Sequence, residues 1–355
     1  MDNSSSLIKQ VCDQIEPIDR SWLNAARERQ LTLTKPPGSL GRLEEIANRL
    51  AAIQRTVTPC VTDKRIYVVA GDHGVTAEGV SAYPREVTAQ MVNNFLRGGA
   101  AINVLARAGG IEVKVVDAGV DADLSDRKEL IHAKAMRATA NFAVGPAMTR
   151  GDAERCVAAG IELARAAAND GIDLLGIGEM GIGNTTTAST ITAVLLGLDP
   201  ETVTGRGTGI DDEGLARKIA VIRRAVEINK PDASNATDIL AKVGGAEIGM
   251  MAGIVLGAAA NHLPVVADGF ISTTAAALAL TFQPNARDYL FNGHRSAERG
   301  HAALIDFIGE QSLLDLSMRL GEGTGAALAM NVIEAAAKLL SEMATFGDAG
   351  VSNKE

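Results

Sequence analysis

From about residue 62 onward, short runs rich in β-branched residues alternate with long alanine-rich stretches of helical character. This alternation limits the fold more than any other feature, because it is typical of a parallel sheet covered by helices on both faces. The runs predict five strands, at residues 65–70, 113–117, 173–176, 264–267 and 289–291. We therefore expect an α/β fold built around a parallel sheet.

Both ends of the chain are predominantly helical. Near the N-terminus, a stretch with two prolines and two glycines cannot continue a helix and leads into a predicted helix at residues 42–53. Near the C-terminus, residues 326–343 have the spacing of an amphipathic helix. We predict a small helical domain formed by residues 1–60 and 306–355, beside a large Rossmann-like α/β domain at residues 61–305.

The composition excludes several classes of protein. With 355 residues, 46% of them hydrophobic, the chain can bury a large core. A net charge of -9 and few aromatic residues argue against nucleic acid as a partner, because its binding needs positive charge and stacking surfaces. The longest apolar run, at residues 248–260, is shorter than the roughly 18 residues that span a bilayer. We expect a buried helix there and no membrane association.

The cysteines and the N-terminus indicate a reducing compartment. Cys12, Cys60 and Cys156 lie far apart, without the spacing of a disulfide framework or of a zinc site. The N-terminal residues lack the basic segment followed by an apolar one that marks a secretory signal. We therefore expect a cytoplasmic protein.

Polar turns that contain glycine follow four of the predicted strands, at residues 71–74, 178–181, 268–269 and 292–295. In an open parallel sheet, ligands bind outside the carboxyl ends of the strands. These turns should therefore line one crevice, which is the predicted site.

Residues 176–181 match the G-x-G-x-x-G spacing of a dinucleotide site, which makes a nicotinamide-dependent dehydrogenase one alternative function. Two features oppose it. The following helix begins late, near Thr185, and the expected acidic residue, Asp199, lies in a turn instead of at a strand end. The stretch also resembles a P-loop, but Asn184 stands where a lysine would hold a triphosphate.

The same stretch retains features that suit a single phosphate. Thr185, Thr186 and Thr187 stand at a helix start, where hydroxyl groups and free amides can bind an anion. A plain glycine turn with a threonine N-cap explains these residues equally well, and the residues alone leave both alternatives open. Lys218, in a predicted helix at residues 215–228, either points back toward an anion or lies on a solvated face.

Seven motifs occur in order along nearly the whole chain. They are KPPGSLGRL at 35–43, AGDHGV at 70–75, GEMGIGNTT at 178–186, TGRGTG at 204–209, ADGF at 267–270, GHRS at 293–296 and LGEGTG at 320–325. On these motifs the chain resembles the nicotinate-nucleotide:5,6-dimethylbenzimidazole phosphoribosyltransferase family, whose enzymes make the lower-ligand nucleotide of cobalamin.

The resemblance implies an activity and an architecture. The activity is transfer of the 5-phosphoribosyl group from nicotinate mononucleotide to 5,6-dimethylbenzimidazole, which gives alpha-ribazole 5'-phosphate and nicotinate. The architecture is a parallel-sheet large domain, a small helical domain from both chain ends, and a homodimer. The resemblance also implies that the enzyme uses no metal and no cofactor.

The resemblance assigns the role of catalytic base to Glu322, in the LGEGTG motif. When one benzimidazole nitrogen attacks the anomeric carbon, the proton on the other nitrogen must leave, and a carboxylate within reach can accept it. The glycines around Glu322 let the backbone turn closely beside a flat ring. On the residues alone, Glu322 is better interpreted as a surface carboxylate in the turn before the next helix.

The expected substrate contacts share a position in or near these motifs. They are Ser81, Tyr83, Gln90, Glu179, Gly181, Asn184, Thr185, Lys218, Asp268, Gly269, Ser296 and Leu320, with Arg295 as a further candidate for the phosphate or ribose. Glu179 either acts on the ribose or is a turn residue satisfied by backbone amides, and Asp72 and Asp268 are either structural or ribose-facing. His73 and His294 lack a third ligand at metal spacing. A regulator that binds nucleotide without turnover is the remaining alternative.

Overall fold

The computed structural model describes residues 3–352 and contains a six-stranded sheet in which every pair of neighbours is parallel. The strands are β1 (Lys64–Gly71), β2 (Ile111–Gly119), β3 (Ile131–His132), β4 (Leu174–Met180), β5 (Val265–Ala267) and β6 (Leu290–Asn292). Their order is β3-β2-β1-β4-β5-β6. The direction of winding therefore reverses between β1 and β4, as in doubly wound nucleotide-binding folds.

The five predicted strands are confirmed, with two corrections. β3 was not predicted, because two residues at the sheet edge carry no apolar run. β4 extends through Met180, so Glu179 lies on the strand and not in a turn. The glycines at 176 and 178 suggested an early turn, but they keep extended strand pairing with β1. Their missing side chains leave room for another segment, since a Cβ at Gly178 would overlap the backbone of Gly323.

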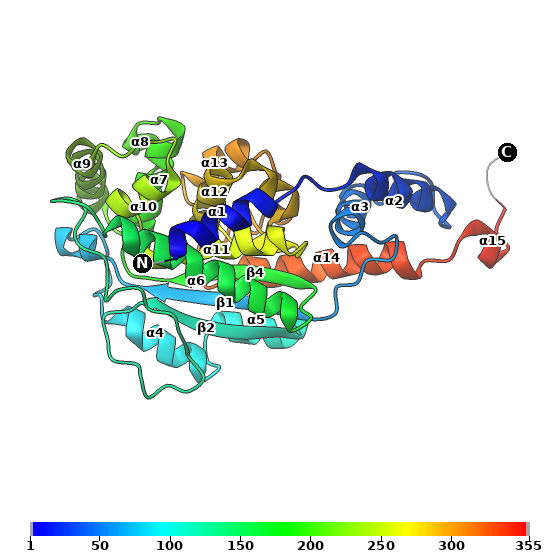
Figure 1. The fold of residues 1–355 in the computed structure, drawn as a ribbon, viewed down its shortest axis with the longest axis horizontal. Coiled ribbons are helices and arrows are strands. Elements are labelled where there is room, and N and C mark those ends of the chain that lie inside the picture. The colour runs from blue at the N-terminus through cyan, green and yellow to red at the C-terminus, as the bar shows by residue number, and fades with distance from the viewer. Residues whose placement is uncertain (1–2, 353–355) are drawn as a thin grey trace.

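Helices lie on both faces of the sheet (Figure 1), and alternate residues of β1 reach the two helical layers. The Tyr67 hydroxyl donates to the Leu163 carbonyl of α6 (Arg150–Asn169), on the face that α6 shares with α11 (Ala246–Ala260). Ile66 points the other way, toward Gly323 at the start of α14 (Thr324–Glu342). The sheet is thus buried on both faces, which explains why its strands read as nearly continuous apolar runs.

Further helices lie around this framework. They are α4 (Val87–Leu96), α5 (Ala101–Gly109), α7 (Asn184–Leu196), α8 (Pro200–Val203), α9 (Asp212–Asn229), α10 (Ala236–Val243), α12 (Phe270–Phe282) and α13 (His301–Ile308), with 3-10 segments at Gly74–Glu78 and Pro284–Tyr289. The predicted buried helix at residues 248–260 lies within α11, which is apolar on all sides after Glu247 in its first turn. Within residues 3–352, no helix is both long enough and apolar enough to cross a membrane.

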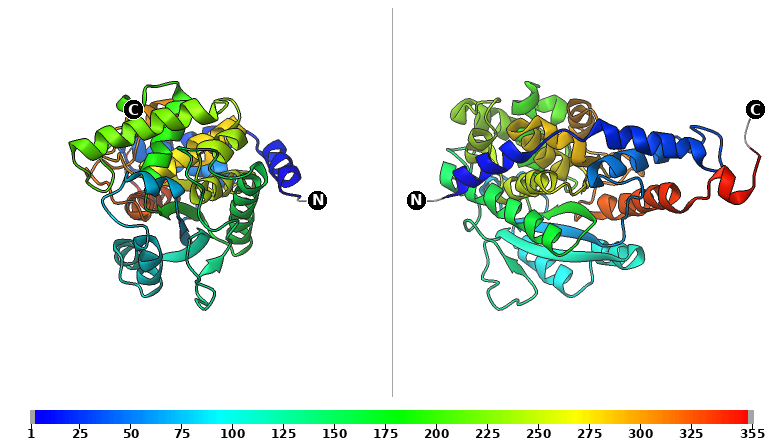
Figure 2. Two further views of the ribbon diagram at one scale, coloured as in Figure 1. Left: turned by 90° about the vertical axis from the view of Figure 1, so that its left-hand side faces the viewer. Right: turned by 45° about the vertical axis from the view of Figure 1, so that its right-hand side comes forward.

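Helices from the two chain ends pack together and extend away from the sheet (Figures 1 and 2). They are α2 (Arg20–Thr32), α3 (Arg42–Gln54) and the C-terminal part of α14, with α15 (Phe346–Ala349) beyond. The Arg29 side chain of α2 donates to the Leu340 carbonyl of α14 at 2.8 Å. α1 (Ser4–Gln14) lies elsewhere, against α6 and α11. The division into domains at residues 60 and 305 stays a prediction. Residues 1–2 and 353–355 of the predicted small domain lie outside the described residues.

α6 and α11 pack closely against each other on one face of the sheet, and this contact depends on glycine. A Cβ at Gly160 of α6 would overlap the Met250 carbonyl of α11, and a Cβ at Gly253 of α11 would overlap the Val157 carbonyl of α6. The two backbones therefore touch directly. Protein interiors are close-packed, so this contact cannot admit a methyl group without moving a helix.

We predict that Gly253→Ala lowers the free energy of unfolding by about 1–3 kcal/mol, because the added methyl group pushes α6 and α11 apart. Urea denaturation measures this change. Gly151→Ala is the control, since a Cβ in that first turn of α6 would meet nothing closer than 3.5 Å and alanine favours helix. Equal stability of wild type and Gly253→Ala would contradict the close contact.

Candidate active site

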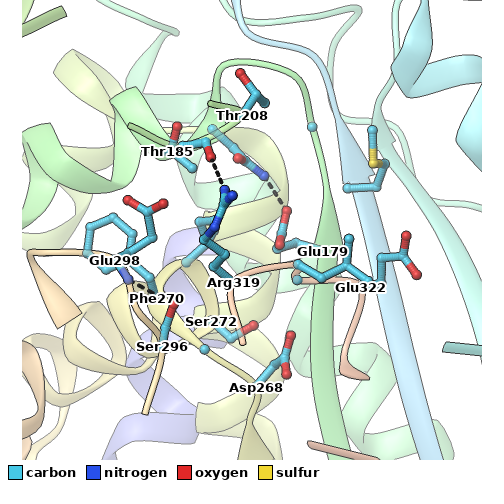
Figure 3. A pocket seen from close by; sticks show the side chains of 18 of the residues that line it. Glu179, Thr185, Thr208, Asp268, Phe270, Ser272, Ser296, Glu298, Arg319 and Glu322 are labelled. Carbon is cyan, nitrogen blue, oxygen red and sulfur yellow. Dashed lines mark hydrogen bonds between the residues drawn. The ribbon is translucent and has the colours of Figure 1, made fainter. Parts of the chain in front are cut away.

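A cavity of about 440 Å³ lies at the C-terminal ends of β4, β5 and β6 (Figure 3). The turns after these strands, α4 and the loop before α14 form its walls. The predicted residues that line it are Tyr83, Glu179, Gly181, Asn184, Thr185, Asp268, Gly269, Ser296, Leu320 and Glu322. Three of the four predicted polar turns thus meet at one cavity. The fourth, at residues 71–74, does not line it.

Glu322 is held in an unusual backbone conformation. Its φ is +63°, between φ values of +86° at Gly321 and +90° at Gly323. The left-handed region costs a non-glycine residue roughly 1–2 kcal/mol, so the surrounding contacts must enforce it. The turn passes directly over the end of β4, since a Cβ at Gly321 would overlap the Glu179 carboxyl group. Glycine on both sides is therefore a steric requirement here.

Asp268, after β5, supplies the contacts that enforce this turn. Its Oδ2 accepts a hydrogen bond from the Gly323 amide at 3.0 Å, and its Oδ1 accepts from the amides of Gly325 at 2.6 Å and Ala326 at 3.1 Å. The N-cap of α14 is Gly323, which has no side chain to cap the helix. Asp268 provides that cap from a distant part of the chain. These bonds favour the structural alternative for Asp268 over a ribose contact.

The Glu322 side chain is 6% exposed and lines the cavity, so it is not the surface carboxylate that the residues alone suggested. Its Oε2 accepts a hydrogen bond from the Ile102 amide, in the first turn of α5, at 3.3 Å. Burial and the nearby charge of Asp268 raise the pKa of Glu322, while the Ile102 amide opposes the rise. A raised pKa makes the Glu322 carboxylate a stronger base.

Glu179 is another of the carboxyl groups that line the cavity, and its environment differs from that of Glu322. Burial raises its pKa to about 8, and the charges of Asp268 and Glu247 add to the effect. The Asn184 side-chain amide donates to Glu179 Oε2, which partly offsets the rise. The Glu179 carboxyl group is therefore largely protonated near neutral pH and can donate a hydrogen bond. Within residues 3–352, the hydrogen-bond partner of the Glu179 side chain is the Asn184 side chain and not a backbone amide, which counts against the alternative of a turn residue satisfied by backbone amides.

One side of the cavity has features that suit an anion. α7 begins at Asn184 after Gly183, so the helix lacks the predicted threonine N-cap and Thr185 lines the cavity instead. Lys218 Nζ donates to Thr185 Oγ1 at 2.8 Å and to the Gly205 carbonyl at 3.3 Å. Lys218 is 0% exposed, which excludes the solvated alternative, and burial lowers its pKa to about 8. Lys218 does not line the cavity, but it is bonded to Thr185, which does.

Several lining residues were not predicted. Arg319 lies centrally in Figure 3, and its Nη1 donates to the Gly207 carbonyl at 3.1 Å. An apolar group completes the walls: Val87, Met91, Ile182, Phe270 and Ile271. Val87 and Met91 are four residues apart on α4 and so share a helix face, which a search for helical spacing could have found.

Other predicted contacts lie outside the cavity. Ser81 is close to its mouth, where its hydroxyl group lies 3.4 Å from the Thr208 hydroxyl group. Gln90 is exposed on α4, and Arg295 is exposed after β6. Asp199 is the N-cap of α8, which supports the argument against a dinucleotide site.

The fold and the cavity define an α/β protein with a nucleotide-sized site at the edge of a parallel sheet where the strands have their carboxyl ends. The chain belongs to the phosphoribosyltransferase family that matches residues 15–351. It is similar to the nicotinate-nucleotide–dimethylbenzimidazole phosphoribosyltransferases of Chloroflexus aggregans, at 55% identity over 350 residues and 99% of each chain, and of Geobacter sulfurreducens, at 54% identity over 98% of this chain and 99% of the relative.

Solved structures agree with this assignment. Two of them come from Thermus thermophilus. CobT matches with a TM-score of 0.90 and 51% identity, over 94% of this chain and 100% of that one. A nicotinate-nucleotide-dimethylbenzimidazole phosphoribosyltransferase matches with a TM-score of 0.89 and 49% identity, over 95% of this chain and 100% of that one. The predicted family and the predicted fold class are confirmed.

We predict that Asp268→Asn loosens the Glu322 turn, because an amide nitrogen replaces one of the two oxygens that accept backbone hydrogen bonds. Hydrogen exchange at Gly323, Gly325 and Ala326 should accelerate, and the free energy of unfolding should fall by about 1–3 kcal/mol. Mass spectrometry of peptides that cover α14 measures the exchange. Unchanged protection there would mean that Asp268 does not hold the turn.

We predict a pH dependence of stability from Glu179. Its pKa is about 8 in the folded protein against an ordinary value of 4.5, so between these values the folded form binds more protons than the unfolded chain. The contribution of Glu179 to stability is therefore full below about pH 4.5 and is lost as pH rises toward 8. Urea denaturation at about pH 5 and pH 8.5 should show wild type losing stability relative to Glu179→Gln. A constant difference between the two proteins would contradict the raised pKa.

Proposed function

We propose that this chain transfers the 5-phosphoribosyl group from nicotinate mononucleotide to 5,6-dimethylbenzimidazole, with alpha-ribazole 5'-phosphate and nicotinate as products. The observation that carries the proposal is Glu322, a buried carboxyl group held on a strained turn in the wall of a nucleotide-sized cavity. The full-length similarity to phosphoribosyltransferases of that name supports the choice of substrates.

The donor phosphate is proposed to bind at the first turn of α7. The partial positive charge at a helix N-terminus attracts anions, and Thr185 adds a hydroxyl group that Lys218 orients. Arg319 provides positive charge inside the cavity itself. One helix terminus and two cations suit a monophosphate. The Asn184 side chain is bonded to Glu179, so we do not assign it to the phosphate.

Glu179 is proposed to hold the ribose. A carboxyl group that stays protonated near neutral pH donates a hydrogen bond, so it suits a ribose hydroxyl group better than it suits a developing positive charge. When the bond between the anomeric carbon and the pyridinium nitrogen breaks, its electron pair goes to that nitrogen. Nicotinate therefore leaves with a neutral pyridine nitrogen. This step needs no general acid. The chemical demand therefore falls on the incoming base.

Glu322 is proposed to meet that demand. The lone pair of one benzimidazole nitrogen forms the new bond to the anomeric carbon, and the proton on the other nitrogen passes to the Glu322 carboxylate. The apolar walls formed by Met91, Ile182 and Phe270 suit a flat dimethylated ring. Entry and departure on opposite faces of the ribose invert the configuration at the anomeric carbon. Holding both rings in line contributes roughly 7–11 kcal/mol to the acceleration.

The proposal extends to the setting of the enzyme. The family resemblance supports a homodimer that acts in the cytoplasm. A net charge of -9 argues against nucleic acid as a partner.

The test is to incubate the protein with nicotinate mononucleotide and 5,6-dimethylbenzimidazole, and to quantify nicotinate and ribazole phosphate by chromatography. We expect release of nicotinate only when the base is present. Binding of nucleotide without any product would favour a regulator. Saturable binding of a nicotinamide dinucleotide with hydride transfer would favour a dehydrogenase.

We predict that Glu322→Gln lowers kcat about 10²–10⁴-fold, because the amide cannot accept the ring proton. The variant should fold normally, since glutamine keeps an oxygen for the Ile102 amide. The matched control is an acceptor without an N–H group, 1,5,6-trimethylbenzimidazole, which has no proton to lose. Wild type and variant should turn over this acceptor at similar rates. An equal loss on both acceptors would remove the assignment of Glu322 as base.

A further inference from the structure

Three fully buried side chains form a hydrogen-bonded chain beneath the turn at residues 181–184. His73 Nε2 lies 2.8 Å from Glu247 Oε1, and His73 Nδ1 lies 2.8 Å from Thr187 Oγ1. Each of the three side chains is 0% exposed, and none lines the cavity. The chemistry proposed above uses none of them.

The chemistry of the partners sets the direction of each hydrogen bond. A carboxylate only accepts, so His73 Nε2 donates to Glu247. In the neutral ring the other nitrogen then accepts from the Thr187 hydroxyl group. Losing one partner would leave a buried polar atom unsatisfied, which is costly inside a protein.

A hydroxyl group, an imidazole and a carboxylate in this order match the arrangement of a hydrolytic triad. A nucleophile must reach its substrate, however, and the Thr187 side chain has no exposed surface and no contact with the cavity. The chain of three residues therefore performs no attack. Its part is to hold other groups in place.

The three residues join three structural elements at the ends nearest the cavity. His73 follows β1, Thr187 lies in the first turn of α7, and Glu247 lies in the first turn of α11. Glycines admit the ring between them, because a Cβ at Gly245 would lie 2.5 Å from His73 Cε1 and one at Gly181 would lie 3.2 Å from His73 Nε2. The backbone at Gly181 thus passes close to the imidazole.

We propose that Thr187, His73 and Glu247 are positioning residues that hold the first turn of α7 where it receives the donor phosphate. The inference rests on the proposed function, which places that phosphate beside Thr185, two residues before Thr187. Without the bond from Thr187, the turn shifts relative to β1 and donor binding weakens. The acceptor ring is held mainly by other elements, α4, α12 and the loop at residues 320–322, and only Ile182 comes from the turn before α7, so acceptor binding changes less than donor binding.

The test is Thr187→Val, which removes the hydroxyl group and keeps the shape of the side chain. Calorimetry with nicotinate mononucleotide should give a Kd about tenfold higher than for wild type, which is the loss expected when about one hydrogen bond to the phosphate is misplaced. The KM for 5,6-dimethylbenzimidazole should stay within about twofold. Thr187→Ser, which restores a donor, should return the Kd to near the wild-type value, and Thr187→Cys, a weak donor, should fall between.

The matched control is Thr192→Val, in the same helix. Thr192 is also 0% exposed, but its hydroxyl group donates to the Ala188 carbonyl and not to His73. Its Kd for the nucleotide should equal that of wild type. Equal weakening in Thr187→Val and Thr192→Val, no weakening in Thr187→Val, or no rescue by serine would overturn the positioning role. A wild-type protein that neither binds the nucleotide nor releases nicotinate would instead overturn the proposed function.

Should Thr187→Val not fold, the serine and cysteine variants alone decide the question. A Kd near the wild-type value for serine and a higher one for cysteine supports the positioning role. Equal Kd values for both variants count against it.

Discussion

The carboxylate of Asp268 is the contact on which the site depends. It accepts the backbone amides of Gly323, Gly325 and Ala326, and so caps a helix whose own N-cap residue is a glycine. The capped helix packs against β4, so the loop before it must cross the end of that strand. Glu322 lies on this loop in a left-handed conformation that only such a constraint maintains.

Glu179 and Glu322 are two of the carboxyl groups that line the cavity, and crowding of negative charge gives them different properties. Burial raises the pKa of both Glu179 and Glu322, and the charge of Asp268 adds to each rise. The charge of Glu247 raises the pKa of Glu179 further, whereas Glu322 accepts a hydrogen bond from the Ile102 backbone amide. Carboxyl groups whose environments separate their pKa values can divide the roles of hydrogen-bond donor and proton acceptor. The proposed mechanism uses this division.

The sequence predicted the framework well where local patterns decide it. Apolar β-branched runs located five strands, and the glycine turns located the cavity, because parallel strands end at one edge. The sequence did not predict the role of a residue where that role depends on contacts between distant segments. Gly178 looked like a turn residue, although its missing side chain serves packing against Gly323. Phe270 was missed because an apolar residue in a cavity wall has the same pattern as one in the core. Arg319 directly precedes the predicted motif at residues 320–325, but it was missed because the sequence alone does not show that its side chain lines the cavity.

The central claim is that Glu322 takes the proton of the acceptor ring. A crystal structure with 5,6-dimethylbenzimidazole and an unreactive analogue of nicotinate mononucleotide tests it most directly. The account predicts a Glu322 carboxylate oxygen about 2.6–3.2 Å from the ring nitrogen that bears hydrogen, with the other ring nitrogen facing the anomeric carbon. A ring bound with its N–H group directed at solvent or at another residue, and Glu322 bonded only to the Ile102 amide, would contradict it.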